Sequence, residues 1–447
     1  ASWDVNYEEL GIYAQNAIEL AEKRGGDQVV VNVQNQKIAY FGAKNDASAK
    51  NSRVGVRINA QTIRDFIEKS SNVIIMGHNQ ADLDAFGAMI AVYHMAIASK
   101  KQAFLVIEPT KLDKTVQKIF EIVKEDLPAL VESCLDTDAV LKLITPDSLL
   151  IVVDTQSPKM VMSTEVLDKA SKLIVIDHHR VGEESFDALF SFIEPYASST
   201  IELMMELLNF YNMEEEIKIS PLEATIMYGG LVVDTNNFSY RTGARSFEVA
   251  AKLKDLGADV TSVKLWLRRD LMRTLEINKL LGNVEIYLEK FAFVMTPDVY
   301  EDRILLAQVA DAALQINGVD AAFMIARMDA TTIGVSARSY QNINVQILME
   351  ALGGGGHLNS AAAQIKDTSV HNVYDELKNY IDLEYGGGGE PVKVILLEDV
   401  KGKGKKDDVI EVAGGYGQFL VTQKKGILAS DENLTELNRA KEEAFQE

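Results

Sequence analysis

The stretch Leu173-Ile-Val-Ile-Asp-His-His179 decides the fold, because an apolar run of strand length ends directly in three polar side chains. The same arrangement occurs in Leu149-Leu-Ile-Val-Val-Asp154. Two further apolar runs, residues 72–76 and 230–233, are also followed by acidic or imidazole side chains. Continuous apolar runs of this length are typical of strands that are buried on both faces.

Helical patterns separate these runs, for example at residues 88–100 and 201–211, and a fifth apolar run covers residues 103–107. Short apolar strands that alternate with helices predict an α/β fold, with a parallel sheet and helices on both faces. In such sheets ligands bind at the carboxyl ends of the strands. The polar residues that follow the runs are therefore the candidate functional residues.

Composition narrows the function classes. The chain has 447 residues, 47% of them hydrophobic, which is enough for two or three domains with buried cores. A formal net charge of −21 argues against a protein that follows a long nucleic acid, which needs a basic groove. It favours short substrates held by metal ions. The single cysteine, Cys134, has no intramolecular disulfide partner, so a reducing, cytoplasmic setting is expected.

No run of ~18 apolar residues could span a bilayer, so we expect no membrane contact by this sequence. The beginning, Ala-Ser-Trp-Asp-Val-Asn, is polar and does not resemble a signal peptide. It reads like the middle of a domain, and we therefore expect the chain to be a piece of a longer protein.

Four clusters at predicted strand ends carry the candidate chemistry. Their shared feature is a carboxylate or imidazole directly after an apolar run, and the members are His78, Asp82, Asp84, Asp154, Asp177, His178, His179 and Asp234. Taken singly, a strand-end Asp is often a helix N-cap, and a lone His is often a hydrogen-bonded core residue. Four clusters at one edge of a sheet favour a metal site instead. Oxygen and nitrogen donors without thiolates suit manganese, and less strongly magnesium, iron or zinc.

These four signatures, in this order, resemble the DHH phosphoesterase superfamily, and the triplet Asp177-His178-His179 matches its name-giving motif. The resemblance covers roughly residues 55–385, and the Gly353-Gly-Gly-Gly-His357 run resembles the DHH-associated substrate domain. The chain looks most like the GdpP-type cyclic-di-AMP phosphodiesterases. Their degenerate GGDEF module is matched by Arg24-Gly-Gly-Asp-Gln28. Such relatives carry membrane helices upstream, which implies a cytoplasmic fragment of a membrane-tethered parent.

The resemblance implies two divalent metal ions, most simply manganese. One ion would be held by His78, Asp82 and Asp154, and the other by Asp84, Asp154, His178 and Asp234. Asp154 would bridge the two ions. Asp177 would orient an imidazole. His179 would contact the scissile phosphate or protonate the leaving 3′-oxygen, with a purely structural hydrogen bond as the alternative.

Substrate contacts are expected from a second group of residues. Backbone N–H groups of Gly353, Gly354, Gly355 and Gly356 can approach a phosphate or a base, although a glycine run can also be a linker. His357 follows this run. Arg338, in Ser336-Ala-Arg338, would supply a phosphate fork, and Arg241 could do so from the catalytic domain. Leu358 stands where an aromatic residue is expected, which argues against base stacking there.

The C-terminal tail resembles the N-terminal RNA-binding domain of ribosomal large-subunit protein nine, through Val392-Lys-Val-Ile-Leu-Leu397 and the basic loop at residues 401–406. Residues 391–447 hold nine Lys and Arg against eleven Asp and Glu. RNA or ribosome contact is therefore a hypothesis only. The expected domains are a degenerate GGDEF-like part (1–50), the DHH domain (51–270), the DHH-associated domain (271–385), a Gly-rich linker (386–390) and a small α+β tail (391–447).

The favoured function is metal-dependent hydrolysis of cyclic-di-AMP to 5′-pApA, with a homodimer implied by the resemblance. One alternative is an oligonucleotide exonuclease or nanoRNase acting on short linear nucleotides. Another is a non-catalytic module that senses nucleotides or docks on the ribosome. The incomplete N-terminal part offers no full cyclase site.

Overall fold

The computed structural model describes residues 14, 17–18, 28–31, 39–42, 53–179, 185–211, 216–340, 343–385, 392–398, 405–412, 417, 420–421, 424–430, 433–435, 437 and 439. Three predicted features lie outside these residues: the GGDEF-like motif at residues 24–27, the Gly-rich linker at 386–390, and most of the basic loop, 401–404. The chain divides into two units, Ala1–Arg269 and Asp270–Glu447.

The first unit is built around a six-stranded sheet with the strand order β5-β4-β3-β6-β7-β8. Every neighbouring pair is parallel, so the predicted α/β class with a parallel sheet is confirmed. The strands are β3 (Val73–Met76), β4 (Ala103–Val106), β5 (Cys134–Leu135), β6 (Leu149–Val153), β7 (Lys172–Asp177) and β8 (Phe190–Ile193). A separate antiparallel pair, β1 (Gln28–Val31) and β2 (Ala39–Gly42), precedes them.

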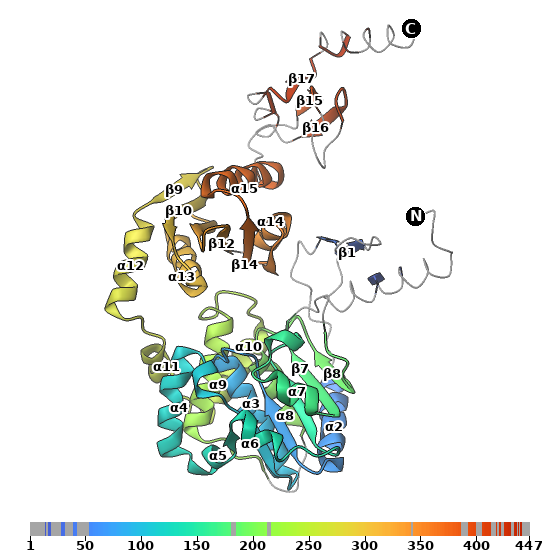
Figure 1. The fold of residues 1–447 in the computed structure, drawn as a ribbon, viewed down its shortest axis with the longest axis vertical. Helices are drawn as coiled ribbons and strands as arrows, with labels where there is room; N and C mark the ends of the chain where they lie inside the picture. The colour runs from blue at the N-terminus through green and yellow to red at the C-terminus, as the bar shows by residue number, and fades with distance from the viewer. Residues whose placement is uncertain are drawn as a thin grey trace. The chain divides into compact units, whose positions relative to one another are not determined.

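Helices cover both faces of this sheet, and Figure 1 shows α2 behind the strands and α7 in front of them. Side-chain alternation explains the two layers: Phe190 of β8 stacks on Phe66 of α2, whereas Leu173 of β7 and Leu167 of α7 line one pocket. The helices are α2 (Arg53–Lys69), α3 (Leu83–Ala98), α4 (Lys114–Asp126), α5 (Pro128–Glu132), α6 (Thr137–Leu141), α7 (Thr164–Lys169), α8 (Thr200–Phe210), α9 (Pro221–Asp234), α10 (Ala244–Asp255) and α11 (Val260–Trp266), with short 3-10 turns at Pro109–Lys111 and Pro158–Met160.

One strand prediction is wrong: residues 230–233 form the last turn of helix α9, not a strand. A short apolar run cannot be assigned to strand or helix by periodicity alone. The start of the helix has a clear signal, because Ser220 and Glu223 form a capping box and Pro221 occupies the first turn. Asp234 therefore reaches the site from the end of a helix.

The position of the first acidic pair also differs from expectation. Helix α3 begins at Leu83, five residues before the predicted start, because the Asp82 carboxylate caps it by accepting a hydrogen bond from the Ala85 amide. Asp82 is thus the N-cap and Asp84 lies in the first turn, rather than on a strand-end loop. Helix geometry, not loop geometry, fixes the spacing of these two carboxylates.

Helices α3 and α9 pack at very close range where Gly230 meets Asp84. A methyl group on Gly230 would lie 2.7 Å from the Asp84 Cα and 2.9 Å from the Leu83 carbonyl oxygen. Both contacts are with backbone, which cannot move aside as a flexible side chain can. The close approach places the α9 end, with Asp234, against the beginning of α3.

We expect Gly230→Ala to lower the free energy of unfolding by about 1–3 kcal/mol, because it overpacks this contact. Urea unfolding followed by circular dichroism measures the change. Gly55→Ala in helix α2 is the matched control, since nothing lies within 4 Å of its added methyl group. Alanine there should be neutral or stabilising through helix propensity. Equal stability of Gly230→Ala and the unchanged protein would contradict the packing described.

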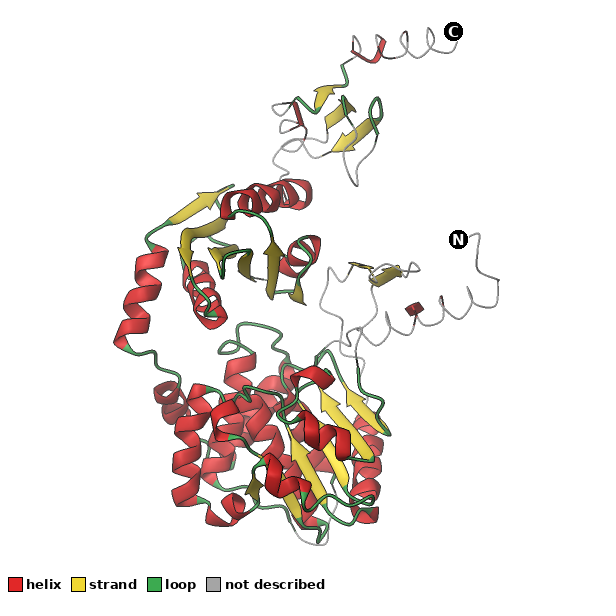
Figure 2. Ribbon diagram, in the orientation of Figure 1, coloured by secondary structure: helices red, strands yellow, loops and turns green. Residues whose placement is uncertain are grey.

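The second unit contains a mixed sheet with the strand order β13-β14-β12-β11-β10-β9, in which only β10 and β11 pair in parallel. One core cluster lies between this sheet and the helices α14 and α15, and α13 buries further apolar side chains such as Leu305 and Val309. Figure 2 distinguishes the helices of this unit, in red, from its strands, in yellow. The elements are α12 (Leu271–Leu281), β9 (Val284–Tyr287), β10 (Phe291–Val299), α13 (Arg303–Leu314), β11 (Ala321–Arg327), β12 (Thr332–Ser339), α14 (Val345–Ala351), β13 (Gly355–His357), β14 (Ser360–Lys366) and α15 (Val370–Tyr385).

The tail forms a small antiparallel sheet with the order β16-β15-β17, made of β15 (Val392–Leu396), β16 (Val409–Val412) and β17 (Gly426–Leu428). Val394 and Leu396 of β15 are buried together with Leu420. Within the part of the chain that the structure describes, no helix is both long and apolar enough to cross a bilayer.

Candidate metal centre

The candidate residues of the first unit come together at the carboxyl ends of three neighbouring strands. His78 follows β3, Asp154 follows β6, and Asp177 closes β7. Because β3, β6 and β7 are adjacent and parallel, their carboxyl ends meet at one edge of the sheet. Asp154 has a positive φ of 62°, an uncommon conformation that turns its carboxylate into the site.

Asp82 and Asp154 flank His78 in the first group of side chains. The His78 Nε2 atom lies 3.7 Å from Asp82 Oδ1 and 3.4 Å from Asp154 Oδ2. The other ring nitrogen, Nδ1, is 2.7 Å from the Asn79 carbonyl oxygen, which can only accept. Nδ1 therefore carries a proton, and Nε2 is the ring nitrogen that faces the two carboxylates.

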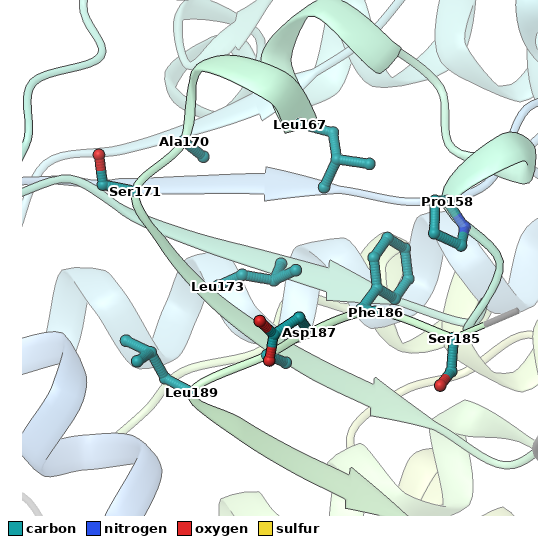
Figure 3. Close-up of a pocket in the computed structure, with 10 residues that line it drawn as sticks. Pro158, Leu167, Ala170, Ser171, Leu173, Ser185, Phe186, Asp187 and Leu189 are labelled. Atoms are coloured by element: carbon teal, nitrogen blue, oxygen red, sulfur yellow. The ribbon is translucent and has the colours of Figure 1, made fainter.

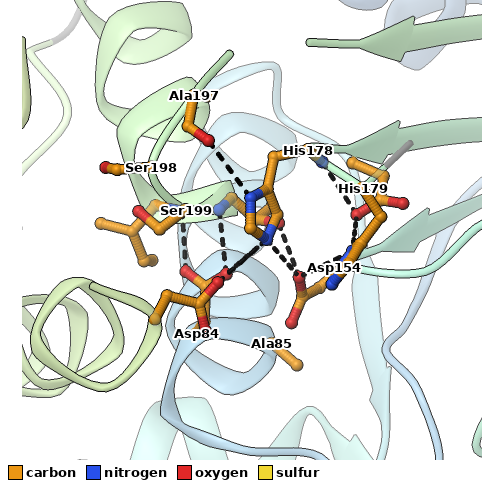
Figure 4. A network of polar contacts seen from close by, with 12 residues as sticks. Asp84, Ala85, Asp154, His178, His179, Ala197, Ser198 and Ser199 are labelled. Carbon is orange, nitrogen blue, oxygen red and sulfur yellow. Dashed lines mark hydrogen bonds and ion pairs between the residues drawn. The ribbon is translucent and has the colours of Figure 1, made fainter. Parts of the chain in front are cut away.

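His178 is the centre of the second group. Its Nε2 atom is 2.9 Å from Asp234 Oδ2, 3.5 Å from Asp154 Oδ1 and 3.8 Å from Asp84 Oδ2. The imidazole is fully buried, and Nε2 makes no hydrogen bond. Figure 4 shows this ring between Ala197 on one side and Asp84 and Asp154 on the other. A buried nitrogen that faces three carboxylates without a hydrogen bond is a feature that a cation would explain.

Asp154 takes part in both groups with different oxygens. Its Oδ2 atom faces His78, while its Oδ1 atom faces His178. The candidate ligand atoms of each group lie within 4.8 Å of one another. A carboxylate that offers one oxygen to each group has the geometry needed to bridge two cations.

The buried carboxylates of the centre need a positive charge, or a proton, to be stable. Burial, and then the charges of Asp154 and Asp234, raise the pKa of the Asp84 carboxyl well above its usual value. Burial lowers the pKa of His78, but hydrogen bonds and charges from Asp154 and Asp82 outweigh it and raise this pKa to about 12. Carboxylates this deeply buried are stable only when they are protonated or paired with a cation.

The side chains present fit divalent metal ions. The two groups supply carboxylate oxygens and imidazole nitrogens, without thiolates, and Cys134 is not among them. This set suits manganese or magnesium better than a structural zinc site. The sequence-predicted ligands are thus close enough together to act as two sets that share one residue.

His179 and Asp177 form a pair beside the two groups. The His179 Nδ1 atom is 2.6 Å from Asp177 Oδ1, which also accepts a hydrogen bond from the His178 amide. Asp177 is fully buried, whereas the His179 side chain is 42% exposed. Asp177 therefore orients the ring of His179 and the backbone of His178. The exposed His179 ring is accessible to a ligand.

A strained turn follows Asp234. Asn236, Asn237 and Phe238 all have positive φ values, of 45°, 56° and 62°. Asparagine tolerates this conformation, but it is uncommon for a bulky residue such as phenylalanine, and such strain often marks functional segments. The Thr235 hydroxyl holds the turn by accepting a hydrogen bond from the Phe238 amide.

Arg241, at the end of this turn, has a buried Nη1 atom without a hydrogen-bond partner. Its charge reaches the centre. Burial lowers the pKa of His178, the carboxylates of Asp154 and Asp234 raise it well above its usual value, and Arg241 then lowers it in part. A guanidinium whose charge acts on the buried His178, and which has an unsatisfied N–H group, is suited to bind an anion.

In the second unit, Arg338 lies on β12 and Gly355–His357 form β13, and β14 lies between these two strands. Arg338 Nε lies 3.1 Å from Asp311 Oδ1, and its Nη1 donates to the Ser336 hydroxyl and the Ala337 carbonyl. A methyl group on Gly354 would lie 2.1 Å from the Ala362 carbonyl oxygen, so strand β14 explains that glycine.

Two glycines of the run have a different environment. Methyl groups on Gly353 and Gly355 would meet nothing within 4 Å, and these positions face open space. His357 ends strand β13 and pairs with Ser360. Leu358 is 8% exposed and belongs to the buried core, so its side chain offers no stacking surface.

A separate pocket of about 420 Å³ lies beside helix α7, and Leu167, Leu173 and Phe186 are among the apolar residues that line it (Figure 3). None of the predicted site residues lines it. The chemistry of the site is therefore not expected there.

The helix predicted at residues 201–211 corresponds to α8, but the contacts of its first residue, Thr200, were not predicted. The Thr200 hydroxyl donates to Asp154 Oδ1 at 2.8 Å, and the Thr200 and Ile201 amides donate to the Asp84 carboxylate. A signal was present, because Ser199 and Glu202 match the S-x-x-E pattern of a capping box ahead of an apolar helix. The pattern predicts the start of a helix, but it does not predict which groups the first residues of that helix contact.

Comparison with known families agrees with this architecture. The DHH family, N-terminal domain, matches residues 72–231, and the DHHA1 domain matches residues 290–383. The chain therefore contains a DHH domain followed by a DHHA1 domain. The ribosomal protein L9, N-terminal domain, matches residues 392–437, so the resemblance of the tail is confirmed as well.

Curated relatives match most of this chain. It is 47% identical to a membrane protein-large ribosomal subunit bL9 fusion protein of Onion yellows phytoplasma, over 98% of the chain and 52% of that protein. It is 39% identical to the cyclic-di-AMP phosphodiesterase GdpP of Bacillus subtilis, over 85% of the chain and 58% of that protein. The chain thus spans about half the length of the curated relatives it matches.

A solved structure has a similar fold. The exopolyphosphatase-related protein from Bacteroides fragilis matches with a TM-score of 0.59 and 19% identity, over 74% of this chain and 98% of that one. At this identity the likeness shows a shared fold only.

Proposed function

We propose that this chain hydrolyses cyclic-di-AMP to 5′-pApA in a reaction that depends on two divalent metal ions, with manganese as the favoured ion. The observation that carries the proposal is Asp154, whose two carboxylate oxygens face His78 and His178 separately. The GdpP relative, named as a cyclic-di-AMP phosphodiesterase, supports the choice of substrate.

Two cations bound here would lower the pKa of a water molecule and neutralise charge on the reacting phosphate. The residues proposed to hold them are His78, Asp82 and Asp154 for one ion, and Asp84, Asp154, His178 and Asp234 for the other. Water adds its oxygen to phosphorus while the bond from phosphorus to the 3′-oxygen breaks. We assign to His179 the protonation of that 3′-oxygen, with Asp177 holding the imidazole in place.

In the first unit, Arg241 is proposed to bind the scissile phosphate. The buried, unpartnered Nη1 atom supports this role, as does the charge that Arg241 exerts on His178. In the second unit, Arg338 and Ser336 are proposed substrate residues, together with the glycine run and His357. Gly353 and Gly355 are the members of the run whose surroundings are open enough for a ligand.

The substrate is tested by comparing initial rates on cyclic-di-AMP, linear pApA and longer oligoadenylates, each with Mn²⁺. We expect cyclic-di-AMP to be cleaved with the highest kcat/KM. A preference for pApA or longer strands would move the assignment to an oligonucleotide exonuclease or nanoRNase. Absence of cleavage of every substrate, together with tight nucleotide binding, would indicate a sensing module instead.

For the tail, we infer contact with RNA from the match to the L9 N-terminal domain and from exposed lysines, Lys405, Lys406 and Lys424. Acidic neighbours weaken this surface, and Lys425 pairs with Glu398 at 3.5 Å. Filter binding of the full chain to ribosomal RNA at low and high salt tests the inference. We expect affinity that falls steeply with salt. If the chain does not bind ribosomal RNA even at low salt, the proposed RNA contact is wrong.

A homodimer and a membrane-tethered parent protein are also proposed. The first rests on the resemblance to GdpP-type relatives, and the second on the phytoplasma relative, whose name describes a membrane protein. Sedimentation at several concentrations measures the oligomeric state of the chain, and a monomer throughout would contradict the first proposal.

A further inference from the structure

The N-terminus of helix α8 contacts the candidate metal ligands from the protein side. The amides of Thr200 and Ile201 donate to Asp84 Oδ2 and Oδ1, each at 2.9 Å. Both oxygens of this carboxylate are therefore fixed by the first turn of a helix, where the helix dipole favours negative charge. The Thr200 side chain is fully buried, and its hydroxyl donates to Asp154 Oδ1 at 2.8 Å.

The loop before α8 fixes His178. The Ala197 carbonyl oxygen lies 3.3 Å from His178 Nδ1, as Figure 4 shows. A carbonyl can only accept, so Nδ1 carries a proton and Nε2 is the ring nitrogen that faces the carboxylates. Histidines that ligate metals commonly use their second nitrogen in this way, which sets both tautomer and ring orientation.

A buried ionic network holds this loop in place. The Glu202 carboxylate accepts hydrogen bonds from the Ser198 amide at 3.2 Å, from the Ser198 hydroxyl, and from the Ser246 hydroxyl at 2.9 Å. Glu202 is only 3% exposed. A buried carboxylate with this many donors is satisfied and therefore rigid.

Arg245 closes the network from helix α10. Its guanidinium pairs with Glu206, lies 3.3 Å from Glu194, and approaches Glu202 at 3.6 Å. The network thus links the loop to two helices, and its rigidity extends to the groups that contact Asp84 and His178.

The hydrogen bonds from residues 197–202 go mainly to one of the two ligand groups. Asp84 and His178 belong to the second group, and Thr200 donates to the one oxygen of Asp154 that faces His178. His78 and Asp82 hydrogen-bond instead to the Asn79 carbonyl and the Ala85 amide.

We propose that Thr200 is a positioning residue for one of the two metal ions, and that residues 197–202 preorganise the ligand set of Asp84, Asp154, His178 and Asp234. Without the hydroxyl, the Asp154 carboxylate can rotate and lose its alignment on the His178 side. The set of His78 and Asp82 keeps its own hydrogen bonds. The inference rests on the proposed function, because it presumes that the centre binds two metals.

The test is a titration of the full chain with Mn²⁺, read by electron paramagnetic resonance. Free Mn²⁺ gives the binding isotherm, and the exchange-coupled signal reports two ions that share a bridging ligand. We expect the unchanged protein to bind two Mn²⁺ with a coupled signal. Thr200→Val, which has the same shape without the hydroxyl, should bind one ion normally and the second about 10- to 100-fold more weakly.

Controls separate positioning from folding. Thr200→Ser keeps a hydroxyl donor at this position, so it should bind the second ion as tightly as the unchanged protein does. Thr225→Val removes another buried hydroxyl of the same unit, one that contacts Pro221 and Asp259 but no candidate ligand, and should bind like the unchanged protein. Should Thr200→Val not fold by circular dichroism, Thr200→Ala takes its place with the same expectation.

The outcomes are distinguishable. Two equally tight ions and an unchanged coupled signal in Thr200→Val would overturn the positioning role while leaving the proposed function intact. A loss shared by Thr200→Ser would also overturn it, because the hydroxyl would not be the cause. Failure of the unchanged protein to bind Mn²⁺ would instead defeat the proposed function.

Discussion

Asp154→Asn is expected to abolish phosphodiester hydrolysis, with kcat falling by at least about a thousand-fold. The amide keeps the size of the side chain but removes the charge and one of the two acceptor oxygens. Because Asp154 faces both His78 and His178, one substitution affects both ligand groups. The loss should therefore exceed that of any change confined to one group, such as Asp82→Asn.

Turnover of cyclic-di-AMP with saturating Mn²⁺ measures this loss, and the Mn²⁺ stoichiometry is measured beside it. Asp147→Asn is the matched control, because it makes the same chemical change at a side chain that is 74% exposed and pairs with Lys172. Circular dichroism shows whether the sheet remains folded. Near-normal turnover in Asp154→Asn would exclude the bridging role.

His179→Asn is expected to lower kcat by about 10²- to 10⁴-fold while leaving Mn²⁺ binding unchanged. The asparagine amide can still donate to Asp177, as Nδ1 of His179 does, but it cannot deliver a proton to a leaving group. A substrate with a good leaving group needs no such proton. We therefore expect the defect to shrink on bis-p-nitrophenyl phosphate, whose leaving group is a stabilised phenolate.

The comparison of the two substrates decides the role of His179. An equal defect on cyclic-di-AMP and on the nitrophenyl ester would show that the residue acts in binding or structure, not as a general acid. His371→Asn supplies the control, since His371 is also paired with an aspartate, Asp375 at 3.4 Å, but is 79% exposed on the second unit. Its activity should equal that of the unchanged protein.

Central strands were the most predictable part of the fold. The runs at residues 72–76, 103–107, 149–153 and 173–176 correspond to β3, β4, β6 and β7, with ends that differ by one residue at most. These strands are buried on both faces, so they are apolar along their whole length. The short edge strands β5 and β8 carry no such signal and were not predicted.

The site shows the limits of strand-end reasoning. Asp154 follows β6 and Asp177 ends β7, but Asp84 and Asp234 belong to helices α3 and α9. Their convergence depends on a close helix crossing at Gly230, which is a property of tertiary packing. Thr200 was missed for a related reason, since its role depends on a contact with a residue 46 positions away in sequence. Sequence patterns report local structure, and such contacts are long-range.

The central claim is tested most directly by product identification. The purified chain is incubated with Mn²⁺ and cyclic-di-AMP, and the nucleotides are separated and identified by mass spectrometry, with and without a chelator. We predict a single product, linear 5′-pApA, that does not form when the metal is chelated. Intact cyclic-di-AMP in the presence of Mn²⁺, from protein shown to be folded and metal-loaded, would contradict the proposed function.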